Sequence, residues 1–178
     1  MKRLILFFLT GIAFSCNDQG SASKDAKKDS TSTTTTAATM NYPYKIDHPD
    51  NWDIGSTANS MIALNAVKAF QDGNVEGSMK YFGDSVHMQF DGLDKKMSND
   101  SLKAMFTTLR KDYKNLDIKM YDWESVISKD KKDEWVTIWY KEKWEDMKGI
   151  KDSSEYINDF QLKDGKIVSL DEYTRKLH

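Results

Sequence analysis

Four runs rich in β-branched and aromatic residues fill the last third of the chain, and short polar segments separate them. The runs span residues 116–128, 134–144, 155–162 and 166–177. Successive strands with short connections pair as an antiparallel meander, and the Asp164-Gly165 dipeptide is a typical hairpin turn. The sequence therefore predicts one long antiparallel sheet. This sheet restricts the fold to those that can cover a large apolar face.

Helical signals precede this sheet. Ser56 or Thr57 can cap a first helix that ends before Gly73. Its expected buried stripe consists of Met61, Leu64, Val67 and Phe70. A second, short helix is expected to place Val75, Met79 and Phe82 on one face and to end near Gly83. A third is expected from Ser98 or Asn99, with a stripe of Leu102, Met105, Phe106, Leu109 and Tyr113.

A short alternating run lies between the second and third helices. Val86, Met88 and Phe90 point to one side of the expected strand, and His87 points to the other. The Asp91-Gly92 pair closes the strand with a turn. Together these elements predict an α+β fold with three N-terminal helices packed on a strongly curved, mainly antiparallel sheet.

Two stretches give the chain a family resemblance: "AFQDGNVEGSMKYFGDSV" at 69–86 and "YINDFQLKDGKIVSLDEY" at 156–173. Their order resembles the nuclear transport factor 2-like superfamily, in its SnoaL-like and ketosteroid-isomerase-like branch. The resemblance covers residues 56–175. It implies a cone-shaped, cystatin-like fold in which a bent sheet wraps a helix around an apolar pocket. It also implies a homodimer formed through the outer face of the sheet.

The resemblance further implies a carboxylate base near the end of the first strand of the isomerase branch. Phe90 occupies that position here, and the adjacent Asp91 is expected to point to the opposite face. The two oxyanion donors of that branch correspond to Ala66 and Asn158. Since only Asn158 can donate a hydrogen bond, we expect no isomerase chemistry of that type.

The expected pocket residues come from three strands. Tyr156, Asn158 and Phe160 share one face of the third run, and apolar neighbours around one amide suit a small, weakly polar ligand. Met88 and Phe90 of the earlier alternating run, and Asp122 of the first run, are expected to join them. The strand carboxylates are expected to lie mostly on the solvated face. They are Asp122, Glu124, Glu142, Asp159 and Asp171.

These features predict a non-catalytic module that binds a small apolar ligand or a protein. One alternative is a SnoaL-like isomerase, lyase or hydrolase that uses Asn158 with a pocket carboxylate such as Asp122. Another is a structural or assembly lipoprotein. No cofactor or metal site is expected, because no glycine-rich phosphate loop follows a strand and the three histidines are widely separated. The absence of a basic stripe argues against nucleic acid as a partner.

The N-terminus carries a separate signal. Lys2 and Arg3 precede a short apolar run that ends in "AFSC", which resembles a bacterial lipobox with Cys16 as the lipidated residue. We therefore expect a signal peptide at 1–15, a lipidated and disordered tether at 16–40, and the folded domain at 41–178. The mature chain would keep 24 basic residues against 28 acidic ones. We expect an exported lipoprotein anchored in the bacterial cell envelope, at the outer membrane, facing the periplasm or the cell surface.

Overall fold

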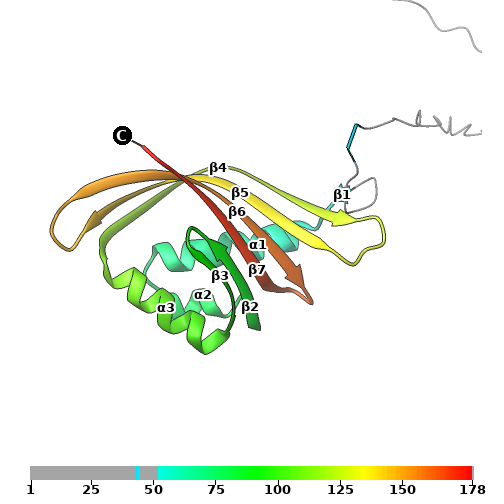
Figure 1. The fold of residues 1–178 in the computed structure, drawn as a ribbon, viewed down its shortest axis with the longest axis horizontal. Helices are drawn as coiled ribbons and strands as arrows, with labels where there is room; N and C mark the ends of the chain where they lie inside the picture. Colours follow the sequence, from blue (N-terminus) through cyan, green and yellow to red (C-terminus); the bar gives the residue numbers. More distant parts are fainter. Residues whose placement is uncertain (1–42, 45–51, 178) are drawn as a thin grey trace, which may run out of the picture. The chain divides into compact units, whose positions relative to one another are not determined.

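In the part of the chain that the structure describes, an arched sheet of seven strands carries three helices on its concave side (Figure 1). The computed structural model describes residues 43–44 and 52–177. The strand order is β1-β4-β5-β6-β7-β2-β3, and every neighbouring pair is antiparallel except β2 and β7. The predicted α+β architecture is confirmed. In chain order the elements are β1 (Trp52–Ile54), α1 (Thr57–Gln71), α2 (Val75–Met79), β2 (Phe82–Phe90), β3 (Leu93–Ser98), α3 (Asn99–Lys111), β4 (Tyr113–Ser128), β5 (Glu134–Asp146), β6 (Lys151–Lys163) and β7 (Lys166–Lys176).

The meander of β4 to β7 forms the arch, as the four sequence runs predicted. Asp164 and Gly165 both have positive φ angles, 52° and 71°, between the paired residues Lys163 and Lys166. Two central residues of this kind match the right-handed twist of the strands that they join. Irregularities in the β4–β5 register, such as that between Met120 and Asp122, bend the sheet further.

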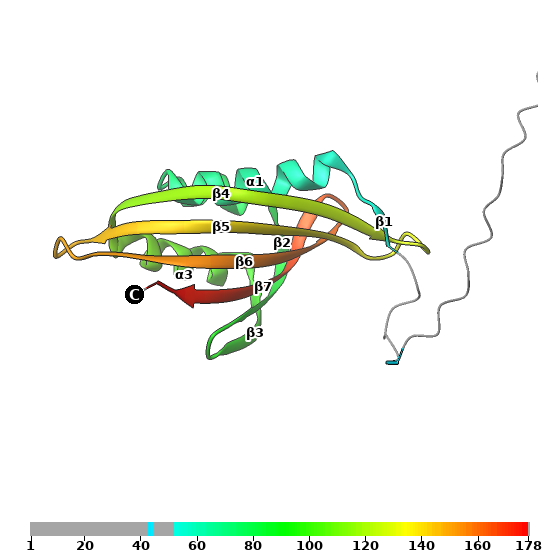
Figure 2. The ribbon, with the colours of Figure 1, turned by 90° about the horizontal axis from the view of Figure 1, so that it is seen from above.

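Helix α1 begins at the expected cap, since the Ser56 side chain accepts a hydrogen bond from the Ala58 amide at 3.1 Å. Three residues of the expected stripe, Leu64, Val67 and Phe70, are partly buried as predicted, but the fourth is not. Met61 is 49 % exposed, whereas Ala63 and Ala66 are fully buried. Small side chains allow the helix backbone to approach the sheet closely, and α1 runs alongside β4 in Figure 2. The sequence pattern favoured the larger residues because it contains no information about the distance between the helix backbone and the sheet.

Strand β2 begins four residues earlier than the alternating run predicted. Phe82 starts this strand and pairs with Ile167 of β7, so it does not extend the second helix. The Ile167 amide donates to the Tyr81 carbonyl at 2.9 Å. A parallel partner more than eighty residues away decides this boundary, and the local pattern cannot reveal it.

Two strands and one boundary were not predicted. The short strand β1 pairs with the end of β4, and β3 pairs with β2 in a hairpin. Both are edge strands with mostly exposed residues, so they lack a buried stripe. Tyr113 starts β4 opposite Asp146 and does not extend the stripe of α3.

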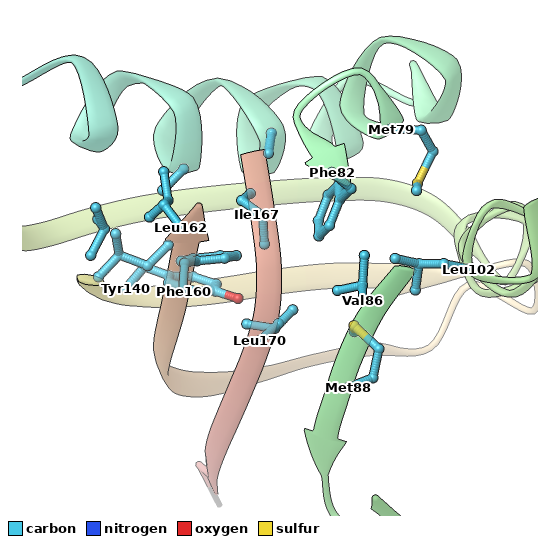
Figure 3. Close-up of a cluster of buried hydrophobic side chains, with 14 residues drawn as sticks. Met79, Phe82, Val86, Met88, Leu102, Tyr140, Phe160, Leu162, Ile167 and Leu170 are labelled. Atoms are coloured by element: carbon cyan, nitrogen blue, oxygen red, sulfur yellow. The ribbon is translucent and has the colours of Figure 1, made fainter. Parts of the chain in front are cut away.

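The core lies between the concave face of the sheet and the helices. In Figure 3, Tyr140, Phe160 and Leu162 come from neighbouring strands, and Phe82, Val86 and Leu102 gather beside α2 and α3. Met88, Val136, Ile138 and Phe160 are each at most 1 % exposed. This row of inward side chains follows the alternation predicted for β2 and for the sheet.

The N-terminal predictions lie outside the described residues. They are the signal peptide at 1–15, the lipidated Cys16 and the tether at 16–40. Among the residues that the structure describes, no helix has the length and apolar character needed to cross a membrane.

Candidate functional site

A cavity of about 150 Å³ opens between the helices and the concave face of the sheet. An engineered cavity of similar size in another protein holds a benzene molecule. Leu109, near the end of α3, lines the cavity and is 40 % exposed. Most of the wall is apolar: Ala66, Val67, Phe70, Phe82, Met88, Phe90, Phe106, Leu109, Ile118, Phe160 and Leu170. The polar lining consists of Ser78, Tyr113, Tyr140, Glu142, Tyr156, Asn158 and Glu172.

The structure brings together five of the residues that the sequence proposed for a pocket. Met88 and Phe90 of β2 line the cavity, and so do Tyr156, Asn158 and Phe160 of β6. In both strands the residues two apart along the chain share the concave face, as a period of two requires. Their placement at one cavity is now established by geometry, and their role in binding stays a prediction.

Asp122 does not lie at this cavity, which corrects its place among the pocket candidates. Met120 pairs with Tyr140 and faces the core, but the register shifts before Asp122 pairs with Trp139. The extra residue reverses the alternation, so Asp122 belongs to the outer face. Its exposed carboxylate accepts a hydrogen bond from the Trp123 amide at 2.8 Å.

Asp91 also lies away from the cavity. It is exposed in the turn between β2 and β3, one residue beyond Phe90. Phe90 itself lines the cavity, at the position where the resemblance placed a carboxylate base. That position is therefore part of an apolar wall.

Two other acids face the cavity, and the sequence analysis did not predict either of them there. Glu142 of β5 is only 7 % exposed, so its assignment to the solvated face was wrong. Glu172 of β7 lines the same space. The missed signal was the alternation along the strand: Glu142 is an even number of residues from the buried Ile138 and Tyr140, so all three share one face. Glu172 likewise lies two residues from the buried Leu170 and shares its face of β7.

Burial changes the acidity of Glu142. The loss of water contact raises the pKa of this carboxyl to about 7, and the nearby Glu172 adds to the rise. The charge of Arg110 opposes it. In the described part of the chain no salt bridge neutralises Glu142, so the group exchanges a proton near neutral pH.

Glu172 shares this environment. Burial raises the pKa of its carboxyl, and hydrogen bonding to the side chains of Asn158 and Thr174 partly offsets the rise. The two glutamates therefore form a coupled pair in which one negative charge disfavours the other.

Asn158 is deeply buried at the site, at 3 % exposure. Its Nδ2 donates to the Tyr140 hydroxyl at 3.3 Å. Its Oδ1 is buried and has no hydrogen-bond partner among the described residues. An unpaired buried acceptor is costly, so this oxygen marks a place where a hydrogen-bond donor would be stabilising.

No protein-family model matches the chain, and no curated protein matches it in sequence. Solved structures do match it in shape. The structure of AusH from Aspergillus nidulans has 19 % identity and a TM-score of 0.57, over 71 % of this chain and 89 % of that one. An NTF2-like protein of unknown function from Burkholderia pseudomallei has 9 % identity and a TM-score of 0.56, over 67 % and 92 %. An LEH-like epoxide hydrolase from M. tuberculosis has 12 % identity and a TM-score of 0.54, over 67 % and 84 %.

This is the nuclear transport factor 2-like fold. At these identities the likeness concerns the fold, and it confirms the architecture that the two sequence stretches implied. The chemistry of the cavity has to be argued from its own residues.

Aromatic rings form one wall of the cavity in this nuclear transport factor 2-like domain. Tyr140 and Tyr156, which are paired across β5 and β6, stack with their ring centres 5.1 Å apart and their planes 11° apart. Burial and the nearby acids raise the pKa of both phenols. Both tyrosines therefore remain neutral at ordinary pH and can donate a hydrogen bond.

Arg110 supplies the positive charge closest to this group, but backbone carbonyls hold its guanidinium. Nε donates to the Phe70 carbonyl at 3.1 Å, Nη2 to the Gln71 carbonyl at 3.1 Å and Nη1 to the Tyr113 carbonyl at 2.8 Å. The side chain thus ties α1, α3 and β4 together. It acts on Glu142 through its charge and does not form a salt bridge with it.

The polar groups do not form a metal site. Among the described residues, no group of three or more His, Cys, Asp or Glu side chains is arranged to hold a metal ion. What the site offers is an apolar cavity with a proton-exchanging acid, a second acid, three phenols and an unpaired amide oxygen.

Proposed function

We propose that this domain is an enzyme that moves a proton on a small, largely apolar molecule, with Glu142 as the group that accepts and returns the proton. The observation that carries the proposal is the position of Glu142 in the apolar cavity, where the pKa of its carboxyl is about 7. A general base works best when its pKa is near the working pH. Burial against apolar walls is a common way to bring a glutamate there.

Tyr140 supplies the complementary group. Its oxygen accepts the hydrogen bond from Asn158, so its own proton is free to be donated to a ligand oxygen. Glu142 lies two residues from Tyr140 on the same strand face, which brings base and donor to the same cavity. A donor of this kind stabilises the negative charge that develops on a carbonyl oxygen when the adjacent carbon loses a proton.

The reaction class is isomerisation or elimination, in which Glu142 takes a proton from carbon, or hydrolysis, in which it takes a proton from the attacking water. This proposal uses a different carboxylate from the one that the family resemblance suggested. It also replaces the enzyme alternative built on Asp122, because that residue lies on the outer face.

Hydrogen exchange on a simple ketone tests the proposal without knowledge of the natural substrate. The full-length chain is incubated in D₂O with excess cyclohexanone, and deuterium incorporation next to the carbonyl is followed by NMR. Glu142 takes the carbon-bound proton, solvent replaces it with deuterium, and the deuteron returns to carbon. We expect exchange above the solvent rate for the wild-type chain and for the outer-face control Asp122→Asn. Equal exchange rates for wild type and Glu142→Gln would overturn the proposal.

A non-catalytic binding module is the second candidate function. It is favoured by Phe90, which lines the cavity at the position of the expected base. This candidate predicts binding of small apolar molecules with no exchange in the D₂O experiment. A purely structural role gains no support from a cavity with two buried acids, because a filled core would be more stable.

We also propose that the outer face of the sheet forms a homodimer and that Cys16 anchors the protein to a bacterial envelope membrane. Tyr121, Ile157 and Tyr173 are 48 %, 39 % and 61 % exposed, and Tyr173 is paired with Ile157 on this face. Large exposed apolar and aromatic side chains are enriched at interfaces. Sedimentation of the full-length chain and of Ile157→Lys tests the dimer, and mass spectrometry of Cys16 from membrane fractions tests the anchor.

A further inference from the structure

The cavity contains a buried acceptor that lacks a donor. Asn158 Nδ2 donates to the Tyr140 hydroxyl, and in this arrangement Oδ1, on the other side of the amide, has no donor among the described residues. The other polar groups of the cavity lining are two carboxyl groups, three phenols and the Ser78 hydroxyl, which donates to the Ala66 carbonyl at 2.8 Å. A ligand that brings N–H or O–H groups would therefore pair an oxygen that the fold leaves unpaired.

The register places an acid beside that oxygen. Asn158 of β6 is directly paired with Glu172 of β7, and cross-strand partners of this kind have their Cβ atoms about 5 Å apart. Glu142 reaches the same cavity from β5. One ligand group with several N–H donors could contact Asn158 Oδ1 and the Glu172 carboxylate together.

The negative charge of the cavity lining favours a cationic amine over neutral or anionic hydrogen-bond donors. The lining contains two carboxyl groups and no lysine, arginine or histidine. Arg110, the nearest cation, has its three donating nitrogens occupied by the carbonyls of Phe70, Gln71 and Tyr113. An anionic ligand would meet repulsion here, whereas a cation would offset the negative charge that two neighbouring acids create.

The aromatic wall adds to this preference. Tyr140 and Tyr156 stack at the cavity beside these acids, and Tyr113 also lines it. Aromatic faces carry negative charge density and attract ammonium groups, most strongly where water is excluded. The apolar remainder of the wall, such as Phe90 and Phe106, suits a hydrocarbon ring.

We propose that the cavity binds a small molecule with a protonated primary or secondary amino group next to an apolar ring, and that Asn158 Oδ1 and Glu172 hold the amino group. The inference rests on the proposed function, because it names the substrate class for the same cavity. In this arrangement Glu172 and Asn158 position the ligand, and Glu142 remains the group that moves the proton.

Three probes of nearly equal shape test the inference: benzylamine, benzyl alcohol and benzoate. Their dissociation constants for the full-length chain are measured by ligand-observed NMR at pH 7.5. We expect benzylamine to bind about tenfold tighter than benzyl alcohol, which corresponds to one additional charged hydrogen bond. We expect no binding of benzoate. Equal or tighter binding of either benzyl alcohol or benzoate would overturn the inference.

Variants locate the preference within the site. Glu172→Gln should lose the preference for benzylamine while still binding benzyl alcohol. Asn158→Leu should also weaken benzylamine binding. Asp122→Asn removes one carboxylate from the outer face and should change neither constant. If Asp122→Asn reduces benzylamine binding as much as Glu172→Gln does, the preference comes from the overall charge and the inference fails.

The cyclohexanone experiment keeps the two proposals separate, because that probe has no amino group. Glu142-dependent exchange without a preference for benzylamine would overturn only the substrate class. A preference for benzylamine without exchange would overturn only the catalytic proposal and would leave an amine-binding module. If benzylamine does not bind, the substrate class is wrong whatever the exchange experiment shows.

Discussion

Asn158 on β6 and Glu172 on β7 are direct partners in the antiparallel ladder, and both side chains line the cavity. The neutral Asn158 amide therefore has the Glu172 carboxyl on the neighbouring strand β7. On β5, the strand on its other side, it donates a hydrogen bond to the Tyr140 hydroxyl. The site thus contains the carboxyl groups of Glu142 on β5 and Glu172 on β7, and the neutral amide of Asn158 lies on β6, the strand between them. The neutrality of residue 158 is essential to this balance.

A third acid at residue 158 should therefore destabilise the fold in a pH-dependent way. Asn158→Asp would bury a carboxylate beside Glu172 with no added cation, and we expect a loss of about 3 kcal/mol in the free energy of unfolding at pH 8. The loss should shrink at pH 5, because the acids then hold protons. Urea unfolding at the two pH values measures both effects.

Asn158→Leu is the matched control for this variant. It removes the unpaired Oδ1 together with the donor to Tyr140, so the two effects oppose each other and we expect a change within about 1 kcal/mol. A similar loss of stability for Asn158→Leu and Asn158→Asp, independent of pH, would show that the shape of residue 158, and not its charge, determines the stability.

Glu142 should make the protein less stable as the pH rises. The pKa of its carboxyl is about 7 in the folded chain against an ordinary value of 4.5, so between these values the folded state holds more protons than the unfolded state. Stability is then highest below pH 4.5 for this group and falls as the pH rises through 7, by about 3 kcal/mol in total.

The comparison with Glu142→Gln isolates this effect from every other titrating group. The amide has the same shape and no charge, so we expect the variant to be as stable as the wild type at pH 5 and more stable by about 2–3 kcal/mol at pH 8. The groups that face Glu142, which include Glu172, Arg110 and the three cavity tyrosines, are unchanged in both proteins. Parallel stability curves for the two proteins from pH 5 to 8 would contradict a raised pKa.

The sequence was sufficient for the architecture because strand alternation and hairpin turns are local. Asp164-Gly165 identifies its hairpin from two residues, and Tyr156, Asn158 and Phe160 share a face by simple parity. The same parity could have placed Glu142 inward beside Tyr140. The prediction failed there because a charged residue was assumed to face solvent.

Other features depend on contacts that no local pattern contains. The irregularity between Met120 and Asp122 inserts one residue and turns Asp122 outward, although neither residue type signals it. The start of β2 at Phe82 depends on its pairing with Ile167. The cavity exists because five strands and three helices leave space at one place, and its volume depends on all of them.

Binding of an amine should release protons from the protein. At pH 7 the Glu142 carboxyl is about half protonated, and a cation in the cavity favours its charged form. We expect up to roughly half a proton to be released per benzylamine bound, since the amine itself stays protonated at this pH. Calorimetry in buffers with different heats of ionisation measures the number. Glu142→Gln should release much less, and equal release from both proteins would assign the proton to another group.

Two alanines of α1 provide a matched test of the cavity itself. Ala66 lines the cavity, whereas Ala63 is fully buried in the core away from it. Ala66→Leu should place its added carbons in the cavity and change stability by less than about 1 kcal/mol, while Ala63→Leu should overpack the core and cost about 1–3 kcal/mol. Ala66→Leu should also weaken binding of benzylamine and benzyl alcohol alike, because it takes up their volume. If Ala66→Leu were as costly as Ala63→Leu and left probe binding unchanged, the probes would bind elsewhere on the protein.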